Sequence, residues 1–302
     1  MFPVARLRAG SGLGLALAGV VVFSFTLPMT KIAVRGIDPL LSGMGRAAVA
    51  SVLAGAILLW RRCTRPTGAQ LRHLAGVVVG VVFGFPLLTA YALRHVPSAH
   101  GSVVNGLLPL ATAGFAVVRA GERPSRRYWL CSLAGLGAIV AYALSQGGGS
   151  LHAADAMLVG AVLIGAVGYT EGALLSRQLG GWQVICWALV AAAPVTWTLS
   201  IARMATGGAA HVTTGQWAAF GYTAVFSALL GFFAWYAGMV RAGIARAGQV
   251  QLLQPGLAVL WGWPLLGERP TLAAIATAAV VLVAVAVGRS AVVHSASGRS
   301  SG

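Results

Sequence analysis

The chain has few charged residues, and acidic residues are the scarcest: its 302 residues include five Asp or Glu in total. Charged residues make up 9% of the sequence and apolar residues 58%. Typical soluble domains carry about 25% charged residues, and a chain this poor in charge could not cover a water-facing surface. The shortage excludes a soluble enzyme or binding domain and indicates a protein that lies within a membrane.

Sequence signatures of enzyme chemistry are also missing. The six histidines lack the HExxH spacing of zinc hydrolases, and the three cysteines are scattered without metal-ligand spacing. Neither a Walker loop nor a Gly-x-Ser-x-Gly elbow occurs. We therefore predict no catalytic residue, no metal and no cofactor. The net charge of +16 is not gathered into a basic face with interleaved aromatic residues, so we predict no nucleic-acid partner.

Apolar runs fill most of the chain, and each is long enough to cross a hydrocarbon core about 30 Å thick. Gly, Pro and Arg residues separate these runs, which we interpret as ten helices. The predicted helices are residues 11–33, 39–60, 72–93, 98–118, 128–145, 154–176, 182–203, 215–240, 245–266 and 271–288. The predicted fold class is therefore an all-α integral membrane protein with ten transmembrane helices.

One set of landmarks occurs twice. The letters Gly-Glu-Arg-Pro stand at 121–124 and again at 267–270, which is 146 residues later. Before each Glu stands a proline inside an apolar run, and before each proline an amide side chain, both at constant spacing. The matching pairs are Pro109 with Pro255 and Asn105 with Gln251. Because one offset relates all three pairs, the sequence predicts a duplicated unit.

Each copy of the unit holds five predicted helices. An odd number places the second copy in the opposite orientation, which gives the inverted-topology repeat that is typical of secondary transporters. Fifteen of the 21 Lys and Arg residues fall on one side of the membrane and five on the other, which places both termini in the cytoplasm. The predicted parts are a cytoplasmic N-terminus (1–10), a first repeat (11–146), a Gly-rich loop (147–152), a second repeat (153–289) and a cytoplasmic tail (290–302).

The two prolines predict breaks in the fourth and ninth helices. A proline inside a helix leaves the carbonyl four residues earlier without its donor, so each break places a bare carbonyl beside an amide side chain. In apolar surroundings such groups need partners, from the substrate or from neighbouring helices. We predict substrate binding here, with purely structural hydrogen bonds as the alternative. The amides concerned are Asn105, Gln249, Gln251 and Gln254.

Two charged residues stand inside apolar segments. Glu171 is a candidate proton or cation site, because an intramembrane carboxylate is costly to bury. The alternative is a side chain that extends to water or to Arg177 at the end of the same helix. Arg46, just inside the second predicted helix, must find a partner or water, and Asp38 is one candidate.

The chain resembles the EamA-domain family of ten-helix carriers, within the drug/metabolite transporter superfamily. The resemblance covers roughly residues 11–289 and rests on Phe23 to Lys31 followed by Arg46, together with the two Pro-to-Gly-Glu-Arg-Pro blocks. It implies a central cavity lined mainly by helices three, four, eight and nine, and the export of amino acids, other metabolites or drugs. Trp235 and Tyr91, which end helices eight and three, become candidate cavity walls, with an interfacial aromatic belt as the alternative.

These observations predict a secondary membrane transporter that exports a small metabolite, an amino acid or an amphipathic compound, by alternating access. Its partners would be the small-molecule substrate and the lipid bilayer, and it would act as a monomer or homodimer. We expect it in the cytoplasmic (inner) membrane of a bacterium. Two alternatives remain: a translocator of lipids or isoprenoid carriers, and an integral-membrane enzyme or assembly subunit that transports nothing.

Overall fold

The computed structural model describes residues 9–146, 153–267, 272–288 and 293–295, and these residues are almost entirely helical. The first half contains α1 (Ala9–Ser24), α2 (Thr26–Ala33), α3 (Pro39–Trp60), α4 (Gly68–Val77), the π-helix η1 (Val78–Gly84), α5 (Phe85–His95), α6 (Ser98–Asn105), α7 (Leu108–Ala120), the strand β1 (Glu122–Pro124) and α8 (Arg126–Gln146). The second half contains α9 (Ala153–Leu179), α10 (Gly181–Ala205), α11 (Thr214–Tyr222), the π-helix η2 (Thr223–Leu230), α12 (Gly231–Ala242), α13 (Ile244–Gln251), α14 (Leu253–Leu266), α15 (Leu272–Gly288) and the strand β2 (Val293–Ser295).

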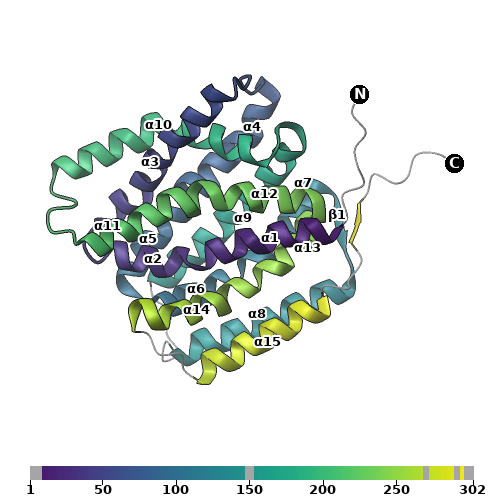
Figure 1. Ribbon diagram of the computed structural model, residues 1–302. Helices are drawn as coiled ribbons and strands as arrows, with labels where there is room; N and C mark the ends of the chain where they lie inside the picture. Colours follow the sequence, from purple (N-terminus) through teal and green to yellow (C-terminus); the bar gives the residue numbers. More distant parts are fainter. Residues whose placement is uncertain (1–8, 147–152, 268–271, 289–292, 296–302) are drawn as a thin grey trace.

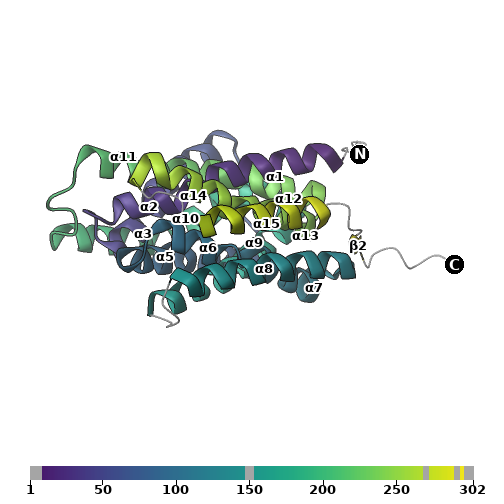
Figure 2. The same cartoon turned by 90° about the horizontal axis from the view of Figure 1, so that it is seen from below.

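The helices lie side by side in one bundle (Figure 1). The pair α8 and α15 forms one edge, α3 and α10 form the opposite edge, and α1 packs on α12 between them (Figure 1). The view from below shows α8 and α15 side by side again (Figure 2). Seven segments of the described chain are long and apolar enough to cross a membrane, including α3, α9 and α10. The predicted all-α class is confirmed by this architecture.

The elements repeat at the offset of 146 residues that the sequence landmarks predict. The π-helices η1 and η2 interrupt the third segment of each half at the same place, and the gaps α6–α7 and α13–α14 interrupt the fourth. Thr67 and Thr213 begin these third segments with matching capping boxes. Gly121 and Gly267 end α7 and α14 with φ of 65° and 72°, a left-handed conformation that favours glycine.

All ten predicted ranges are helical over their described residues, but three of them are divided. The range 11–33 breaks at Phe25, 98–118 at residues 106–107, and 245–266 at Leu252. The strands β1 and β2 pair antiparallel and were not predicted, because three residues are too short to show a strand period. The predicted Gly-rich loop 147–152 and the second Glu-Arg-Pro, at 268–270, lie outside the described residues.

Small residues let the two halves approach closely at the middle of the bundle. A Cβ atom on Gly80 of η1 would lie 2.4 Å from the Ile164 carbonyl oxygen and 2.7 Å from the Gly168 nitrogen of α9. Neither contact is tolerable, so a side chain at Gly80 would push η1 away from α9. Close packing through small residues is how membrane helices associate without a hydrophobic driving force.

The two ends of the bundle are named here by residues that mark them. Asp38 begins α3 at one end, where its Oδ1 accepts from the backbone nitrogen of Leu40 at 2.9 Å. Arg119 closes α7 at the other end. We call these the Asp38 end and the Arg119 end.

Candidate functional site

A small chamber inside the bundle is lined by side chains from both halves. Its lining residues come from α1, α2, α3, η1, α5, α9, η2, α12 and α14, and nearly all of them are buried. They are Phe23, Thr26, Arg46, Val81, Phe85, Tyr169, Ser227, Phe232 and Gln254. The volume of about 20 Å³ has room for roughly one water molecule, so a larger guest requires side chains or helices to move.

Equivalent positions of the two halves face each other across this chamber. Phe23 and Tyr169 are 146 residues apart, and their rings stack at 6.4 Å between centroids. Val81 and Ser227 are related by the same offset, and both line the chamber. In each pair the first half supplies an apolar residue and the second half a hydroxyl. The positions that line the chamber are therefore related by the repeat, while the side chains at those positions differ in chemistry.

Hydroxyl and amide groups of the chamber are held by a short network. The hydroxyls of Thr26 and Ser227 lie 2.8 Å apart. Gln254 donates to the Phe23 carbonyl at 3.2 Å, and Gln251 donates to Gln254 Oε1 at 3.4 Å. These bonds join the break between α1 and α2 to the break between α13 and α14. The places where the backbone is irregular thus meet at the chamber, as expected of irregular backbone within a membrane.

Arg46 provides the chamber's cation. Its side chain comes from the second turn of α3, roughly 10 Å along the helix from the Asp38 end, and the residue is 5% exposed. Its Nε atom is buried without a hydrogen-bond partner. Across the described residues, the guanidinium forms no ion pair, and Tyr169 lines the same chamber.

Asp38 is not the partner that the sequence suggested for Arg46. Asp38 Oδ2 instead accepts from Arg203 at 2.8 Å, while its Oδ1 caps α3. The reason is geometric: an N-cap side chain folds back on the first turn of its own helix, away from a residue two turns further along. Arg46 therefore keeps its charge inside the bundle without a carboxylate from Asp38.

The other acidic side chains that the structure describes are engaged as well. Asp155 Oδ1 lies 2.6 Å from His100 Nε2. Glu171 Oε1 accepts from Arg119 Nε at 2.6 Å, and Glu171 Oε2 lies 2.5 Å from His73 Nδ1. Both clusters lie outside the lining of the chamber.

Glu171 is buried, with 6% of the residue exposed, but it does not reach Arg177 as one reading of the sequence suggested. Its two partners, His73 and Arg119, come from α4 and α7, and Gly76 of α4 leaves the room for its side chain. This cluster ties three helices together at the Arg119 end. Its position separates it from the chamber, so a role as a proton or cation site stays a prediction.

The predicted amides divide into those at the chamber and those beside it. Gln254 lines the chamber, and Gln251 contacts it through its hydrogen bond to Gln254. Asn105 and Gln249 are buried but do not line it. The side-chain oxygens of Asn105 and Gln251 are both buried without a partner, which leaves two acceptors available at the two helix breaks.

Pro109 and Pro255 lie in the first turn of α7 and α14, and are both buried. In a first turn the missing N–H breaks no helical hydrogen bond. The prolines therefore lie just after the breaks at 106–107 and Leu252, at the start of the next helix, and not in the middle of one helix.

Of the two predicted aromatic walls, one lies next to the chamber and the other does not. Trp235 is fully buried, and its ring lies 5.4 Å from that of Tyr169, a lining residue. Tyr91 is 38% exposed and does not line the chamber. The physical reason is helix phase: Tyr91 follows the buried Thr89 and Ala90 of α5 and points away from their face.

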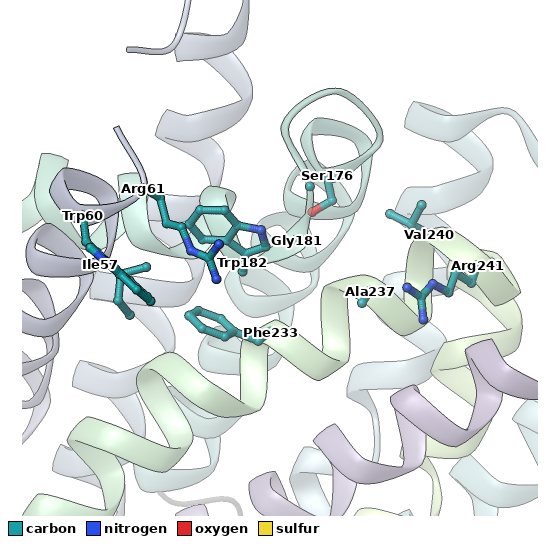
Figure 3. Close-up of a pocket in the computed structure, with 11 residues that line it drawn as sticks. Ile57, Trp60, Arg61, Ser176, Gly181, Trp182, Phe233, Ala237, Val240 and Arg241 are labelled. Carbon is teal, nitrogen blue, oxygen red and sulfur yellow. The ribbon is translucent and has the colours of Figure 1, made fainter. Parts of the chain in front are cut away.

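A larger cavity of about 700 Å³ opens at the Arg119 end, and Figure 3 shows the side chains that line it. Trp60 and Arg61 come from the end of α3, Trp182 from the start of α10, and Phe233 and Arg241 from α12. Arg61 packs over the Trp60 ring at 4.8 Å, and both are exposed. None of the predicted site residues lines this cavity.

No group of three or more His, Cys, Asp or Glu residues within the described ranges is arranged to hold a metal ion. The described chamber instead offers hydroxyls, amides, aromatic rings and one arginine. These groups can bind and orient a small polar molecule. They do not form a nucleophile and base pair.

Comparison with known proteins decides the family. The profile of the EamA-like transporter family matches residues 10–144 and again residues 152–288. The chain belongs to the EamA-like transporter family. It is therefore a multi-pass membrane protein of a transporter family, not of an enzyme family, and its partners are a small-molecule substrate and the bilayer.

Two relatives of the chain are described as transporters. The uncharacterized transporter YdeK of Bacillus subtilis (strain 168) is 45% identical over 279 residues, covering 90% of this chain and 94% of its own. A probable terminal-alkyne amino-acid exporter of Streptantibioticus cattleyicolor is 23% identical, covering 83% of this chain and 84% of its own. One solved crystal structure, 18% identical, covers 92% of this chain and 96% of its own with a TM-score of 0.71, which shows a shared fold.

Several chamber residues escaped the reading of the sequence. Thr26, Ser227 and Phe232 sit in apolar segments where nothing distinguishes them from ordinary core residues. Tyr169 could have been found, because it stands 146 positions after Phe23, as Gln251 does after Asn105.

Proposed function

We propose that the protein is a secondary carrier that exports a small metabolite, an amino acid or an amphipathic compound, by alternating access. The observation that supports this most directly is the chamber, which both halves of the chain line with residues at equivalent positions. A site shared by two copies of one unit can open to either side when one copy moves against the other.

We further propose ten transmembrane helices in two inverted five-helix repeats, with both termini in the cytoplasm of a bacterial cell. The seven long apolar segments, the pair α8 and α15, and the segment made of α13 and α14 supply the ten helices for this arrangement. The basic residues gathered at the Arg119 end, among them Arg61 and Arg241, support a cytoplasmic location for that end. The chain would act as a monomer or homodimer in the inner membrane.

The carrier would use its irregular segments to move. The π-helices η1 and η2 contribute Val81 and Ser227 to the chamber, and the breaks at 106–107 and Leu252 divide the helices beside it. Irregular turns concentrate at functional sites and hinge positions because their backbone can change with little loss of regular hydrogen bonding. The chamber of about 20 Å³ then corresponds to a closed state between the two open ones.

Export is tested with the full chain in proteoliposomes loaded with radiolabelled amino acids and organic acids. The proposal expects saturable release that unlabelled substrate outside accelerates, because a carrier exchanges through one site. Vesicles with and without a pH gradient distinguish proton coupling from facilitated exchange. Release no faster than from protein-free vesicles, for all compounds and both gradients, would contradict a carrier.

A further inference from the structure

The charge of the chamber is not balanced by the protein. The described lining contains one cation, Arg46, and no anion. The acidic side chains that the structure describes, Asp38, Asp155 and Glu171, have other partners. A buried, unpaired guanidinium is strongly unfavourable in a membrane interior. Exposure of 5% leaves Arg46 little contact with bulk water.

We propose that Arg46 is the receptor for the carboxylate of the transported molecule. This rests on the proposed carrier function and narrows its substrate to a small monocarboxylate. A guanidinium presents planar, paired donors that match the two oxygens of a carboxylate, and the Arg46 Nε donor has no partner within the protein. One unpaired cation matches one negative charge. A phosphate dianion would leave a charge without compensation.

A second orphaned group lies near the first. The Gln251 side-chain oxygen is a buried acceptor without a partner, and Gln251 donates to Gln254, which lines the chamber together with Arg46. An unpaired donor and an unpaired acceptor at the same chamber fit a molecule that carries a carboxylate and a hydrogen-bond donor close together. A 2-hydroxy acid and an α-amino acid both have this arrangement.

The rest of the chamber is apolar and aromatic. Phe23, Phe232 and Tyr169 surround the space, with ring centroids 4.8 to 6.4 Å apart. Such walls favour a compact apolar body on the substrate. The absence of an anion among the described lining residues means that a cationic compound without a carboxylate would meet Arg46 as a repulsive charge.

Binding to the purified full chain in lipid nanodiscs tests the proposal with a matched series of probes. L-leucine and 2-hydroxy-4-methylpentanoate carry both groups, 4-methylpentanoate carries the carboxylate alone, and leucinamide carries the donor alone. A second series, with the same functional groups on a side chain of alanine size, controls for how well the probe fits the chamber. Isothermal titration measures the affinity of each probe. In at least one series, we expect the acid with a donor to bind most tightly, the acid without a donor to bind more weakly, and the amide not to bind.

Variants assign the binding to Arg46. Arg46→Gln should weaken acid binding at least about 30-fold, as removal of one partner from a buried charge pair does. Arg46→Lys should recover part of it, because the charge returns without the paired donors. Arg61→Gln, in the cavity at the Arg119 end, is the matched control and should bind as the natural chain does. If Arg46→Gln cannot be purified in a folded form, the affinity of Arg46→Lys is compared with that of the natural chain instead.

Four results would overturn the proposal: leucinamide binding as tightly as leucine, binding unchanged in Arg46→Gln or Arg46→Lys, sulfate or phosphate binding more tightly than the acids, or no acid of either series binding at millimolar concentration. Failure of the carrier function is separate from all four. It would show as Arg46-dependent binding of the acids with no release from proteoliposomes, which leaves the carboxylate site standing.

Discussion

Arg46 and Glu171 are both charged residues buried inside the bundle, with 5% and 6% of each exposed, yet their surroundings differ in kind. Glu171 is held by Arg119 and His73 at 2.6 and 2.5 Å. Arg46 has a buried Nε without a partner and forms no ion pair among the described residues. Burial alone therefore does not mark a functional charge.

Arg46 and Glu171 differ in whether the protein supplies a partner for their charge, and this difference separates their roles. A buried charge that the protein pairs can hold helices together, and its removal leaves its partners uncompensated. A buried charge that the protein leaves unpaired stabilises nothing in the closed state, so its persistence calls for a partner from outside. Glu171 belongs to the first kind and Arg46 to the second.

After the Arg46 variants, the largest effect should come from the two unpartnered amide oxygens at the helix breaks. Asn105→Leu combined with Gln251→Leu should reduce substrate release from proteoliposomes at least about tenfold, because a lost hydrogen bond to a charged group is worth about 1.5–3 kcal/mol. The thermal midpoint should change little, since both side-chain oxygens lack protein partners. Release at the natural rate, with normal expression, would remove both amides from the site.

Glu171→Gln should destabilise the protein by about 2 kcal/mol and leave substrate binding unchanged. The neutral amide cannot form charged hydrogen bonds to both Arg119 and His73. Chemical unfolding in detergent measures the first effect and titration calorimetry the second. Loss of pH-dependent release with normal stability would instead make Glu171 part of the transport mechanism and erase the contrast with Arg46.

Asp38 extends the comparison to a paired charge at the opposite end of the bundle. Burial raises the pKa of Asp38, but its bonds to Arg203 and to the backbone nitrogens of Leu40 and Leu41 outweigh this and lower that pKa below its ordinary value. The stability that Asp38 contributes is therefore present above about pH 4, its ordinary pKa range, and lost as the pH falls through the lowered value.

Asp38→Asn should consequently lower the free energy of unfolding by about 1 kcal/mol at neutral pH, because the ion pair with Arg203 and the negative charge at the N-terminus of α3 are both lost. Thermal unfolding followed from neutral pH downward should show the gap between variant and natural chain closing in acid. A gap that stays constant or widens in acid would mean that the Asp38 charge does not stabilise the fold.

Tyr91→Ala should have the smallest effect. Its side chain is 38% exposed and lines neither cavity. Exposed substitutions of this kind change the free energy of unfolding by about 0.5 kcal/mol or less. Release from proteoliposomes should match that of the natural chain, and a severalfold loss would place Tyr91 on the substrate path.

The helices could be predicted from the sequence because each is a run of apolar residues between Gly, Pro and Arg. The repeat could be predicted because Pro109 and Asn105 recur unchanged in spacing as Pro255 and Gln251. Both features are local, or depend on a fixed offset. They require no knowledge of which helix faces which.

The site could be predicted only in part, because partners in space do not show in a linear pattern. Glu171 was visible as a buried acid, but its bonds to His73 and Arg119 span 98 and 52 residues of chain. Arg46 was visible as a buried cation, but its lack of a partner emerged once Asp38 was found bound to Arg203. Tyr91 and Trp235 looked alike in sequence, and helix phase decided between them.

Thermal unfolding of Arg46→Met and Glu171→Met, measured side by side without added ligand, tests the distinction between the two buried charges most directly. The account predicts shifts of opposite sign: a midpoint equal to or above the natural one for Arg46→Met, since an unpaired buried charge is removed, and a lower midpoint for Glu171→Met. A midpoint for Arg46→Met that falls as far as that of Glu171→Met would contradict the account and assign Arg46 a structural role.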